Sequence, residues 1–186
     1  DEIIELPQFF LPYLNKNHDN QLTEEFISIW SKSFDNFNFD FSHFVHKDYN
    51  INNLILLPSE KNHLKCGIID FQSAFWGESF WDLFSLLEDS RIYYTDKFNE
   101  EFINYFFSKT NQKISIKEFK HKYHFLNCSR QSRLLGRWIK LSKDLNKNFY
   151  LDFIPVTKQR LKKSLIFLNN DNLTHFYNKY IFDNGI

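Results

Sequence analysis

The most informative stretch of this sequence is HKDYNINNLILLPSEKNHLKCGIIDFQ, residues 46–72. It opens with the pattern HxDxxxxN, formed by His46, Asp48 and Asn53, and it closes with an apolar run that ends at Asp70. These residue types at this spacing are typical of phosphoryl transfer, which needs a group that accepts the proton of an attacking hydroxyl and oxygen ligands for Mg²⁺. The pattern therefore predicts Asp48 as the base and Asn53 and Asp70 as metal ligands.

Two of these residues have a second interpretation. Loops that contain Asn and Asp are common in turns, so a chain rich in Asn could supply Asn53 by chance. An apolar strand that ends in Asp70 and Phe71 coincides with the loop pattern, and this coincidence favours the catalytic interpretation. His46 is expected to order the loop through hydrogen bonds rather than to react.

The residues between the two ends of this stretch predict a β-hairpin. Residues 54–57 fit one strand, residues 58–63 a turn and residues 65–70 a second strand. Such a hairpin would hold Asn53 at the start of one strand and Asp70 at the end of the other. Both metal-binding groups would then lie at one edge.

Apolar residues recur with helical period through most of the remaining chain. The expected fold class is therefore α+β, mainly helical, in one domain over residues 1–186. Thr23 and Asn172 are predicted as N-caps of the first and last long helices. Helices or helical turns are expected at residues 3–14, 23–34, 79–90, 97–109, 116–145, 155–169 and 172–182.

Two longer segments carry a family resemblance. HKDYNINNLILLP and GIIDFQSAFWGESFWDLFSLLEDSR resemble the C-terminal lobe of the aminoglycoside phosphotransferase and choline kinase family. The DFQ triplet, the WDLFSLLED segment and the later SRQSRLLGRW are similar to bacterial kinases that phosphorylate the anomeric hydroxyl of the cell-wall amino sugars N-acetylmuramate or N-acetylglucosamine. The resemblance covers residues 6–167. It implies a protein-kinase-like C-terminal lobe, ATP and Mg²⁺ as cofactors, a small sugar as substrate, and a role for Asp82 in supporting the catalytic loop.

Two positions depart from the family pattern. Relatives often carry His two residues after the base, where this chain has Asn50, and an acid after the DFQ triplet, where it has Ser73. These departures keep open a second class of function, a degenerate lobe that acts as a non-catalytic binding module. Within the enzyme class, an aminoglycoside, choline or another small alcohol is the alternative acceptor.

Features that kinases use to hold ATP are not found in this sequence. None of the four glycines is spaced as a phosphate-covering loop, and no lysine before the 46–72 stretch lies in a plausible strand. Kinases of this kind place both features in a separate N-terminal lobe, and the chain contains no methionine. The chain is therefore expected to be a fragment, inactive alone, whose missing N-terminal lobe is its partner.

Substrate contacts are predicted at two places. Trp76, next to a glycine, is a candidate for stacking on a sugar ring, and core packing is the alternative. Arg130, Arg133 and Arg137 recur on one helical face and could bind an acidic sugar substituent, because guanidinium groups match carboxylates in a two-pronged geometry. The same arginines could instead pair with the acidic N-terminal half.

Charge is divided unevenly along the chain. Residues 1–100 carry 17 acidic and 7 basic side chains, and residues 101–186 carry 6 acidic and 16 basic ones. Mutual compensation is favoured over an RNA partner, because the later lysines alternate with core-type residues and no aromatic and basic RNA platform is found. Cys66 and Cys128 have no metal-binding or disulfide spacing, and no apolar run approaches the ~20 residues that cross a bilayer. A cytoplasmic location without nucleic-acid or membrane partners is expected.

Overall fold

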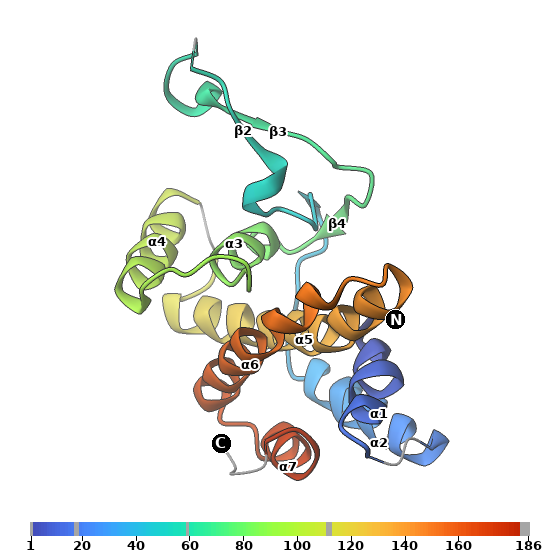
Figure 1. Cartoon of the computed structure of the whole chain (residues 1–186). Helices are drawn as coiled ribbons and strands as arrows, with labels where there is room; N and C mark the ends of the chain where they lie inside the picture. Colours follow the sequence, from blue (N-terminus) through green and yellow to red (C-terminus); the bar gives the residue numbers. More distant parts are fainter. Residues whose placement is uncertain (1, 17–18, 59, 111–112, 183–186) are drawn as a thin grey trace. The chain divides into compact units, whose positions relative to one another are not determined.

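The computed structural model describes residues 2–16, 19–58, 60–110 and 113–182 of the chain (Figure 1). The chain divides into two compact units. We call Asp1–Asn38 together with Lys120–Ile186 the helical unit, and Phe39–Phe119 the hairpin unit. None of the helices in the described ranges is both long and apolar enough to cross a membrane.

The helical unit is built from helices and short helical turns. In chain order these are the turns η1 (Glu2–Ile4) and η2 (Leu6–Phe10), helices α1 (Leu11–Tyr13), α2 (Asn20–Phe34) and most of α5 (Ile116–Asp144), the turn η5 (Asn148–Phe153), and helices α6 (Ile154–Leu168) and α7 (Asp171–Tyr180). The mainly helical prediction is confirmed, and the three longest helices of this unit agree with the predicted ranges to within a few residues.

Both predicted N-caps are wrong. Asp19 caps α2 by accepting a hydrogen bond from the backbone N–H of Leu22 at 2.7 Å. Asn170 caps α7 in the same way, with the N–H of Leu173 at 3.1 Å. Each true cap has an extended backbone just before the helix, which lets its side-chain oxygen reach back to a free N–H group of the first turn.

Aromatic side chains fill the core of the helical unit. Phe26 on α2 packs against Phe176 on α7 with ring centroids 5.1 Å apart, and Trp30 packs against Phe125 on α5 at 5.3 Å. These rings are buried, as is Tyr177. Burial of such large rings is a main source of stability for a unit of this size.

The N-terminal segment lies directly against α5 at Gly136. A Cβ atom on Gly136 would lie 2.0 Å from the backbone oxygen of Glu5 and 2.8 Å from the backbone nitrogen of Leu6. Arg133, three residues before Gly136, pairs with Glu2 at 3.3 Å, and Arg137, the residue directly after Gly136, pairs with Glu5 at 2.8 Å. Glycine therefore allows this close approach, and the two ion pairs hold the segment in place.

The hairpin unit contains two short antiparallel strand pairs and two helices. Strand β1 (His43–Val45) pairs with β4 (Phe75–Gly77), and β2 (Leu54–Leu56) pairs with β3 (Cys66–Ile68). The other elements are the turns η3 (Ile51–Asn53) and η4 (Asn62–Lys65), helices α3 (Trp81–Leu87) and α4 (Asp96–Lys109), and the first residues of α5.

The predicted hairpin is present with shorter strands than expected. Ile55 lies opposite Gly67 in the centre of the ladder. Backbone hydrogen bonds continue beyond the strands at both ends, from the N–H of Leu57 to the oxygen of Lys65 at 2.7 Å and from the N–H of Ile69 to the oxygen of Asn53 at 3.1 Å. The second of these bonds connects the end of the HxDxxxxN pattern to the residue before Asp70.

The helix expected at residues 79–90 is also shorter, and spans Trp81–Leu87. The pairing of β1 with β4 was not predicted. Strands of three residues are too short to show the alternation of polar and apolar residues that identifies a strand in a sequence.

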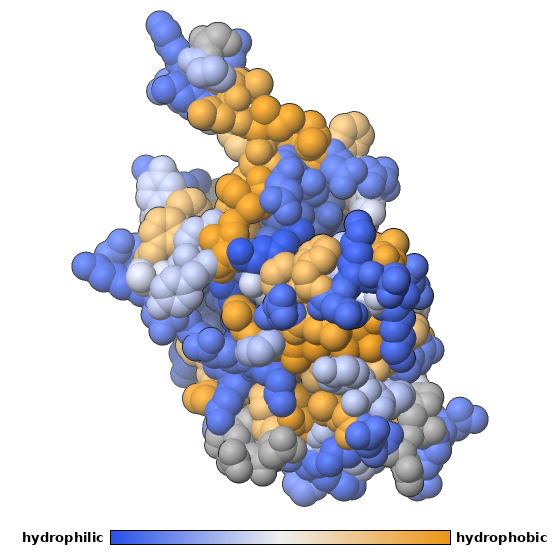
Figure 2. Space-filling view, viewed as in Figure 1, coloured by the Kyte–Doolittle hydropathy of each residue, from blue (hydrophilic) through white to orange (hydrophobic). Residues whose placement is uncertain are grey.

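Apolar side chains are exposed along the hairpin, and Figure 2 shows them as a continuous orange surface. Leu56 is the most exposed of them, at 74%. The others are more than a third exposed and comprise Ile55, Leu57, Leu64 and Ile68.

Candidate active site

Strand β1 leads directly into the loop formed by residues 46–53, and Asp82 holds the start of this loop. The carboxylate of Asp82, in the first turn of α3, accepts hydrogen bonds from the backbone N–H groups of His46 at 2.8 Å and Lys47 at 3.0 Å. Burial raises the pKa of Asp82 above its usual value, and the two backbone N–H groups and His46 oppose that rise. A carboxylate that accepts two backbone bonds at one point fixes the direction in which the loop leaves the strand.

His46 connects the loop to the strand that precedes Asp70. Its Nε2 atom lies 2.9 Å from the backbone oxygen of Ile69, and its side chain is buried. The ring packs edge-on against Tyr49 of the same loop, with centroids 5.9 Å apart. These contacts place His46 between the loop and the hairpin, and its ordering role stays a prediction.

Asp48 and Asn53 meet within the loop. The amide nitrogen of Asn53 donates to the backbone oxygen of Asp48 at 2.8 Å and to its Oδ2 atom at 3.3 Å. Asn53 is buried, whereas the side chain of Asp48 is exposed. The result is a carboxylate that is held from the protein side and open to a reactant on the other.

Asn53 and Asp70 present oxygen atoms of the kind that Mg²⁺ prefers. The amide nitrogen of Asn53 faces Asp48, so its amide oxygen faces away from Asp48. Asp70 follows Ile69, whose N–H bonds to the backbone of Asn53, and Asp70 is exposed with a φ of 69°. One amide oxygen and one carboxylate fit a Mg²⁺ ion whose remaining ligands are phosphate oxygens and water.

Trp76 lies on the surface of the hairpin unit rather than in a core. It is 67% exposed, and its partner across the β1–β4 pair is Phe44, which is 63% exposed. Neighbouring residues of the same pair point to the other face, since successive side chains of a strand alternate. The exposure of Trp76 therefore does not support the alternative that it packs in a core.

Arg130 and Arg133 belong to the helical unit, whereas Asp48, Asn53 and Asp70 belong to the hairpin unit. Arg130 is buried, with 6% of its surface exposed. Arg133 pairs with Glu2 of the N-terminal segment. The carboxylate facing Arg133 thus comes from the protein itself, which favours the alternative that these arginines pair with the acidic half of the chain.

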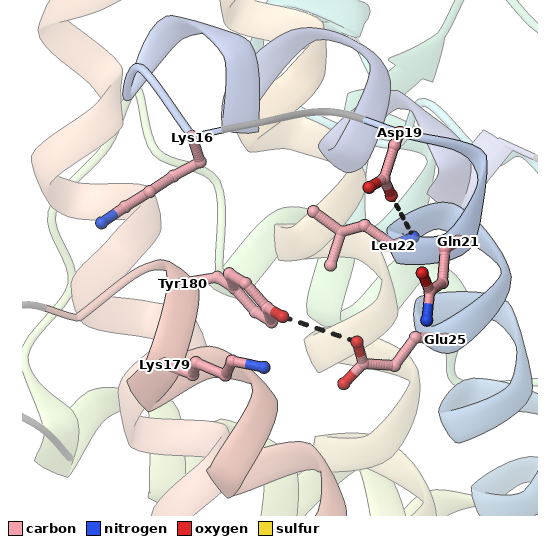
Figure 3. A pocket seen from close by; sticks show the side chains of 7 residues that line it. All are labelled: Lys16, Asp19, Gln21, Leu22, Glu25, Lys179 and Tyr180. Atoms are coloured by element: carbon pink, nitrogen blue, oxygen red, sulfur yellow. Dashed lines mark hydrogen bonds between the residues drawn. The ribbon is translucent and has the colours of Figure 1, made fainter.

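A pocket of about 370 Å³ in the helical unit contains none of the predicted site residues (Figure 3). Figure 3 shows that its polar side chains partly satisfy one another, since Tyr180 donates to Glu25 at 3.5 Å and Asp19 caps the helix at Leu22. The other lining residues are Lys16, Gln21 and Lys179.

One residue of the loop received no role from the sequence. Asn50 was noted as a departure from the family pattern, yet its side chain bonds to Asp48 at 2.9 Å. A local signal exists only for its other bond: an Asn in a turn commonly bonds to the backbone N–H two residues later, as Asn50 does with Asn52 at 3.0 Å.

Comparison with known proteins agrees with this geometry. The model of the phosphotransferase enzyme family matches residues 13–114, which is more than half of the chain. This chain belongs to the phosphotransferase enzyme family.

One individual protein is also similar to this chain. The chain is 31% identical over 112 residues to the N-acetylmuramate/N-acetylglucosamine kinase of Caulobacter vibrioides (strain ATCC 19089 / CIP 103742 / CB 15). The matched region is 60% of this chain and 31% of the relative. This chain therefore spans about a third of the length of the curated protein that it matches.

Proposed function

We propose that the polypeptide containing these residues is an ATP-dependent kinase of a small molecule, and that its acceptor is the anomeric hydroxyl of a cell-wall amino sugar, N-acetylmuramate or N-acetylglucosamine. One observation carries the proposal. The exposed carboxylate of Asp48 is bonded to the amide of Asn53, and the backbone of Asn53 is bonded to the residue before Asp70. A base and two metal-binding oxygens are thereby connected through hydrogen bonds within one loop and one hairpin.

Each group has a definite task in this proposal. Asp48 orients the acceptor hydroxyl and accepts its proton. Asn53 and Asp70 hold Mg²⁺, which neutralises charge on the phosphate oxygens of ATP when both are bound. His46 and Asp82 keep the loop in place from its buried side.

The choice of acceptor rests on the matched relative and on Trp76. The relative is a kinase of N-acetylmuramate and N-acetylglucosamine by name. An exposed indole ring offers a flat apolar surface of the kind on which sugar rings stack. Aminoglycosides and small alcohols such as choline are the acceptors that an experiment must separate from amino sugars.

The nucleotide-holding part is proposed to lie outside the present 186 residues. The sequence contains no phosphate-covering glycine loop, and the chain spans about a third of its relative. Residues 1–186 would then act as the kinase-like C-terminal lobe, and activity would need the full natural polypeptide.

The test is ADP release by the full natural polypeptide that contains this chain. It would be supplied with ATP, Mg²⁺ and, in turn, N-acetylmuramate, N-acetylglucosamine, an aminoglycoside and choline, with Asp48→Asn as the control that assigns any release to this site. Release with an amino sugar, giving an acid-labile phosphate, is the expected result. Release only with choline or an aminoglycoside would refute the amino-sugar assignment. No release and no binding of Mg-ATP would favour a non-catalytic binding module.

A further inference from the structure

We propose that Asn50 is a positioning residue that holds the carboxylate of Asp48 in the orientation needed to accept a proton. This inference rests on the proposed function, and it assigns a role to a residue that otherwise counts as a departure from the family pattern. The argument comes from three hydrogen bonds of one buried side chain, together with the bond from Asn53 to the same carboxylate.

The side chain of Asn50 is 1% exposed, and its polar groups are used inside the loop. Its Nδ2 atom donates to the backbone oxygen of Asp48 at 3.0 Å and to Oδ1 of Asp48 at 2.9 Å. Its Oδ1 atom accepts from the backbone N–H of Asn52 at 3.0 Å. Because only the nitrogen donates and only the oxygen accepts, these partners fix the direction in which the amide faces.

A second amide holds the other oxygen of the same carboxylate. Asn53 donates to Oδ2 of Asp48, and Asn50 donates to Oδ1. A carboxylate with one N–H bond on each oxygen resists rotation, yet each oxygen keeps a second lone-pair site. Those remaining sites, on the exposed side of Asp48, are where an acceptor hydroxyl would bind.

Asn50 also connects Asp48 to the proposed metal ligand. Its backbone oxygen accepts from the N–H of Asn53 at 3.0 Å, and its side chain caps the short turn η3, which ends at Asn53. One residue therefore sets the position of the base directly and that of the metal-binding amide through the turn. Reaction rates are sensitive to such positions, because a displacement of about 1 Å can cost on the order of 10²-fold.

The substitution Asn50→Asp separates the donor role from the capping role. Aspartate has nearly the same shape, and its oxygen still caps the turn at Asn52. It has no N–H group, however, and it places an oxygen against Oδ1 of Asp48. The control is Asn104→Asp, which makes the same chemical change at an exposed site on α4 of the same unit. Asn50→His is the rescue variant, since a ring N–H can restore one bond to Asp48.

The expected result with the full natural polypeptide is a fall in kcat of about 10²-fold for Asn50→Asp. The KM values for Mg-ATP and for the acceptor should stay within about twofold, Asn50→His should regain about tenfold in kcat, and Asn104→Asp should match the wild type. A kcat within twofold of wild type for Asn50→Asp would show that Asn50 only caps the turn. Loss of Mg-ATP binding in parallel with kcat would also overturn the proposal, since it would mean a general collapse of the loop.

A second measurement separates this proposal from the proposed function. If the wild-type protein phosphorylates none of the acceptors, the proposed function fails. The hydrogen bond from Asn50 to the carboxylate of Asp48 is then tested by NMR. The side-chain amide protons of Asn50 should exchange slowly with solvent in the wild type and faster in Asp48→Ala, which removes Oδ1 of Asp48 and leaves only the backbone oxygen of residue 48 as an acceptor. Equal exchange rates of these protons in both proteins would overturn the positioning role of Asn50, whatever the activity.

Discussion

Both units contain buried polar side chains that bond within the unit, but the hairpin unit also presents carboxylates at its surface. In the helical unit, several buried polar side chains bond to one another: His124 and Asn127 on α5 both lie 3.0 Å from the hydroxyl of Ser164 on α6, and Gln131 donates to Asn127 at 3.0 Å. In the hairpin unit, Asp48 and Asp70 are exposed. A buried polar network stabilises the fold and offers little to a ligand, whereas exposed carboxylates on an ordered loop are accessible to one.

The units also differ in which residues adopt a left-handed backbone. Among the described non-glycine residues with positive φ, those of the helical unit are Asn15, Asn146 and Asn169. Asn tolerates this conformation, and these three follow the ends of helices. In the hairpin unit, Asn62 shares this conformation, and Lys47 and Asp70 have φ values of 73° and 69°. Asp tolerates this conformation much as Asn does, whereas Lys does not. The unfavourable backbone at Lys47 fits a loop shaped for chemistry more than for stability.

The largest expected effect lies in the hairpin unit. Asp48→Asn should lower kcat by about 10² to 10⁴, because a positioned base typically contributes that much, while Mg-ATP binding changes little. Asp70→Asn should instead weaken Mg-ATP binding, because it would remove a charged ligand of the proposed metal site. Steady-state kinetics and nucleotide titration of the full natural polypeptide would measure both.

Thermal unfolding of the same two variants provides the control. A midpoint close to wild type is expected for Asp70→Asn, whose side chain is exposed. A small loss is expected for Asp48→Asn, because its new amide nitrogen faces one of the N–H donors of Asn50 and Asn53. Near-normal turnover of Asp48→Asn would remove Asp48 from the role of base, and unchanged Mg-ATP affinity of Asp70→Asn would remove Asp70 from the metal site.

The next largest effect is expected on the stability of the helical unit. Gly136→Ala places a methyl group where the backbone of Glu5 now lies, so we expect a loss of about 3 kcal/mol in the free energy of unfolding. On an open helical surface the same change would stabilise the protein by about 1 kcal/mol. Urea denaturation would therefore show by its sign whether the N-terminal segment lies against α5. Ser129→Ala, at a half-buried site on the same helix, is the matched control and should stay within about 0.5 kcal/mol.

A buried histidine of the helical unit, His124, should make the free energy of unfolding depend on pH. Burial, together with Lys163, Lys120 and His121, lowers the pKa of His124 from 6.5 to about 3, and its ring stacks on Phe167 at 4.1 Å. The folded protein therefore keeps His124 neutral, while the unfolded chain takes up a proton below pH 6.5. Stability is fully present above that pH and is lost as the pH falls toward 3.

Comparison with His124→Gln would isolate this contribution from the other titrating groups. Between pH 7.5 and 5.5 the wild type should lose about 1.4 kcal/mol more than the variant in the free energy of unfolding. Urea denaturation at both pH values measures the difference. Equal losses in the two proteins would mean that His124 is accessible to protons in the folded state.

The sequence predicted those parts of the molecule whose cause is local. The 46–53 pattern is chemically specific over a few residues, and the hairpin follows from two apolar runs around a turn. Helix periodicity predicted α4, α5 and α6 to within a few residues. Roles inside the candidate site could be assigned for Asp48, Asn53 and Asp70 because their residue types match one reaction, and these roles remain predictions.

The remaining features depend on tertiary contacts or on choices among similar residues. The N-cap was misplaced because Asp19 and Thr23 are both good caps and only the backbone conformation selects between them. The pairing of Arg133 with Glu2 depends on the close approach at Gly136, which no periodicity shows. The bond between Asn50 and Asp48 was missed because a departure from a family pattern was treated as a loss rather than as a replacement.

The smallest expected effect tests whether the left-handed backbone at Lys47 lowers the stability of the hairpin unit. Lys47→Gly removes a side chain from a left-handed position that costs an L-residue roughly 1–2 kcal/mol. It also frees the unfolded chain and loses a weak contact of Lys47 with the ring of Phe75 at 6.0 Å. We expect a net gain below about 1 kcal/mol in the free energy of unfolding, with the two bonds from the loop to Asp82 unchanged. Asn169→Gly is the matched change in the helical unit and should be closer to neutral, because Asn already tolerates this backbone. Destabilisation by Lys47→Gly would mean that the lysine side chain holds the loop, and the contrast between the two units would then not extend to their backbones.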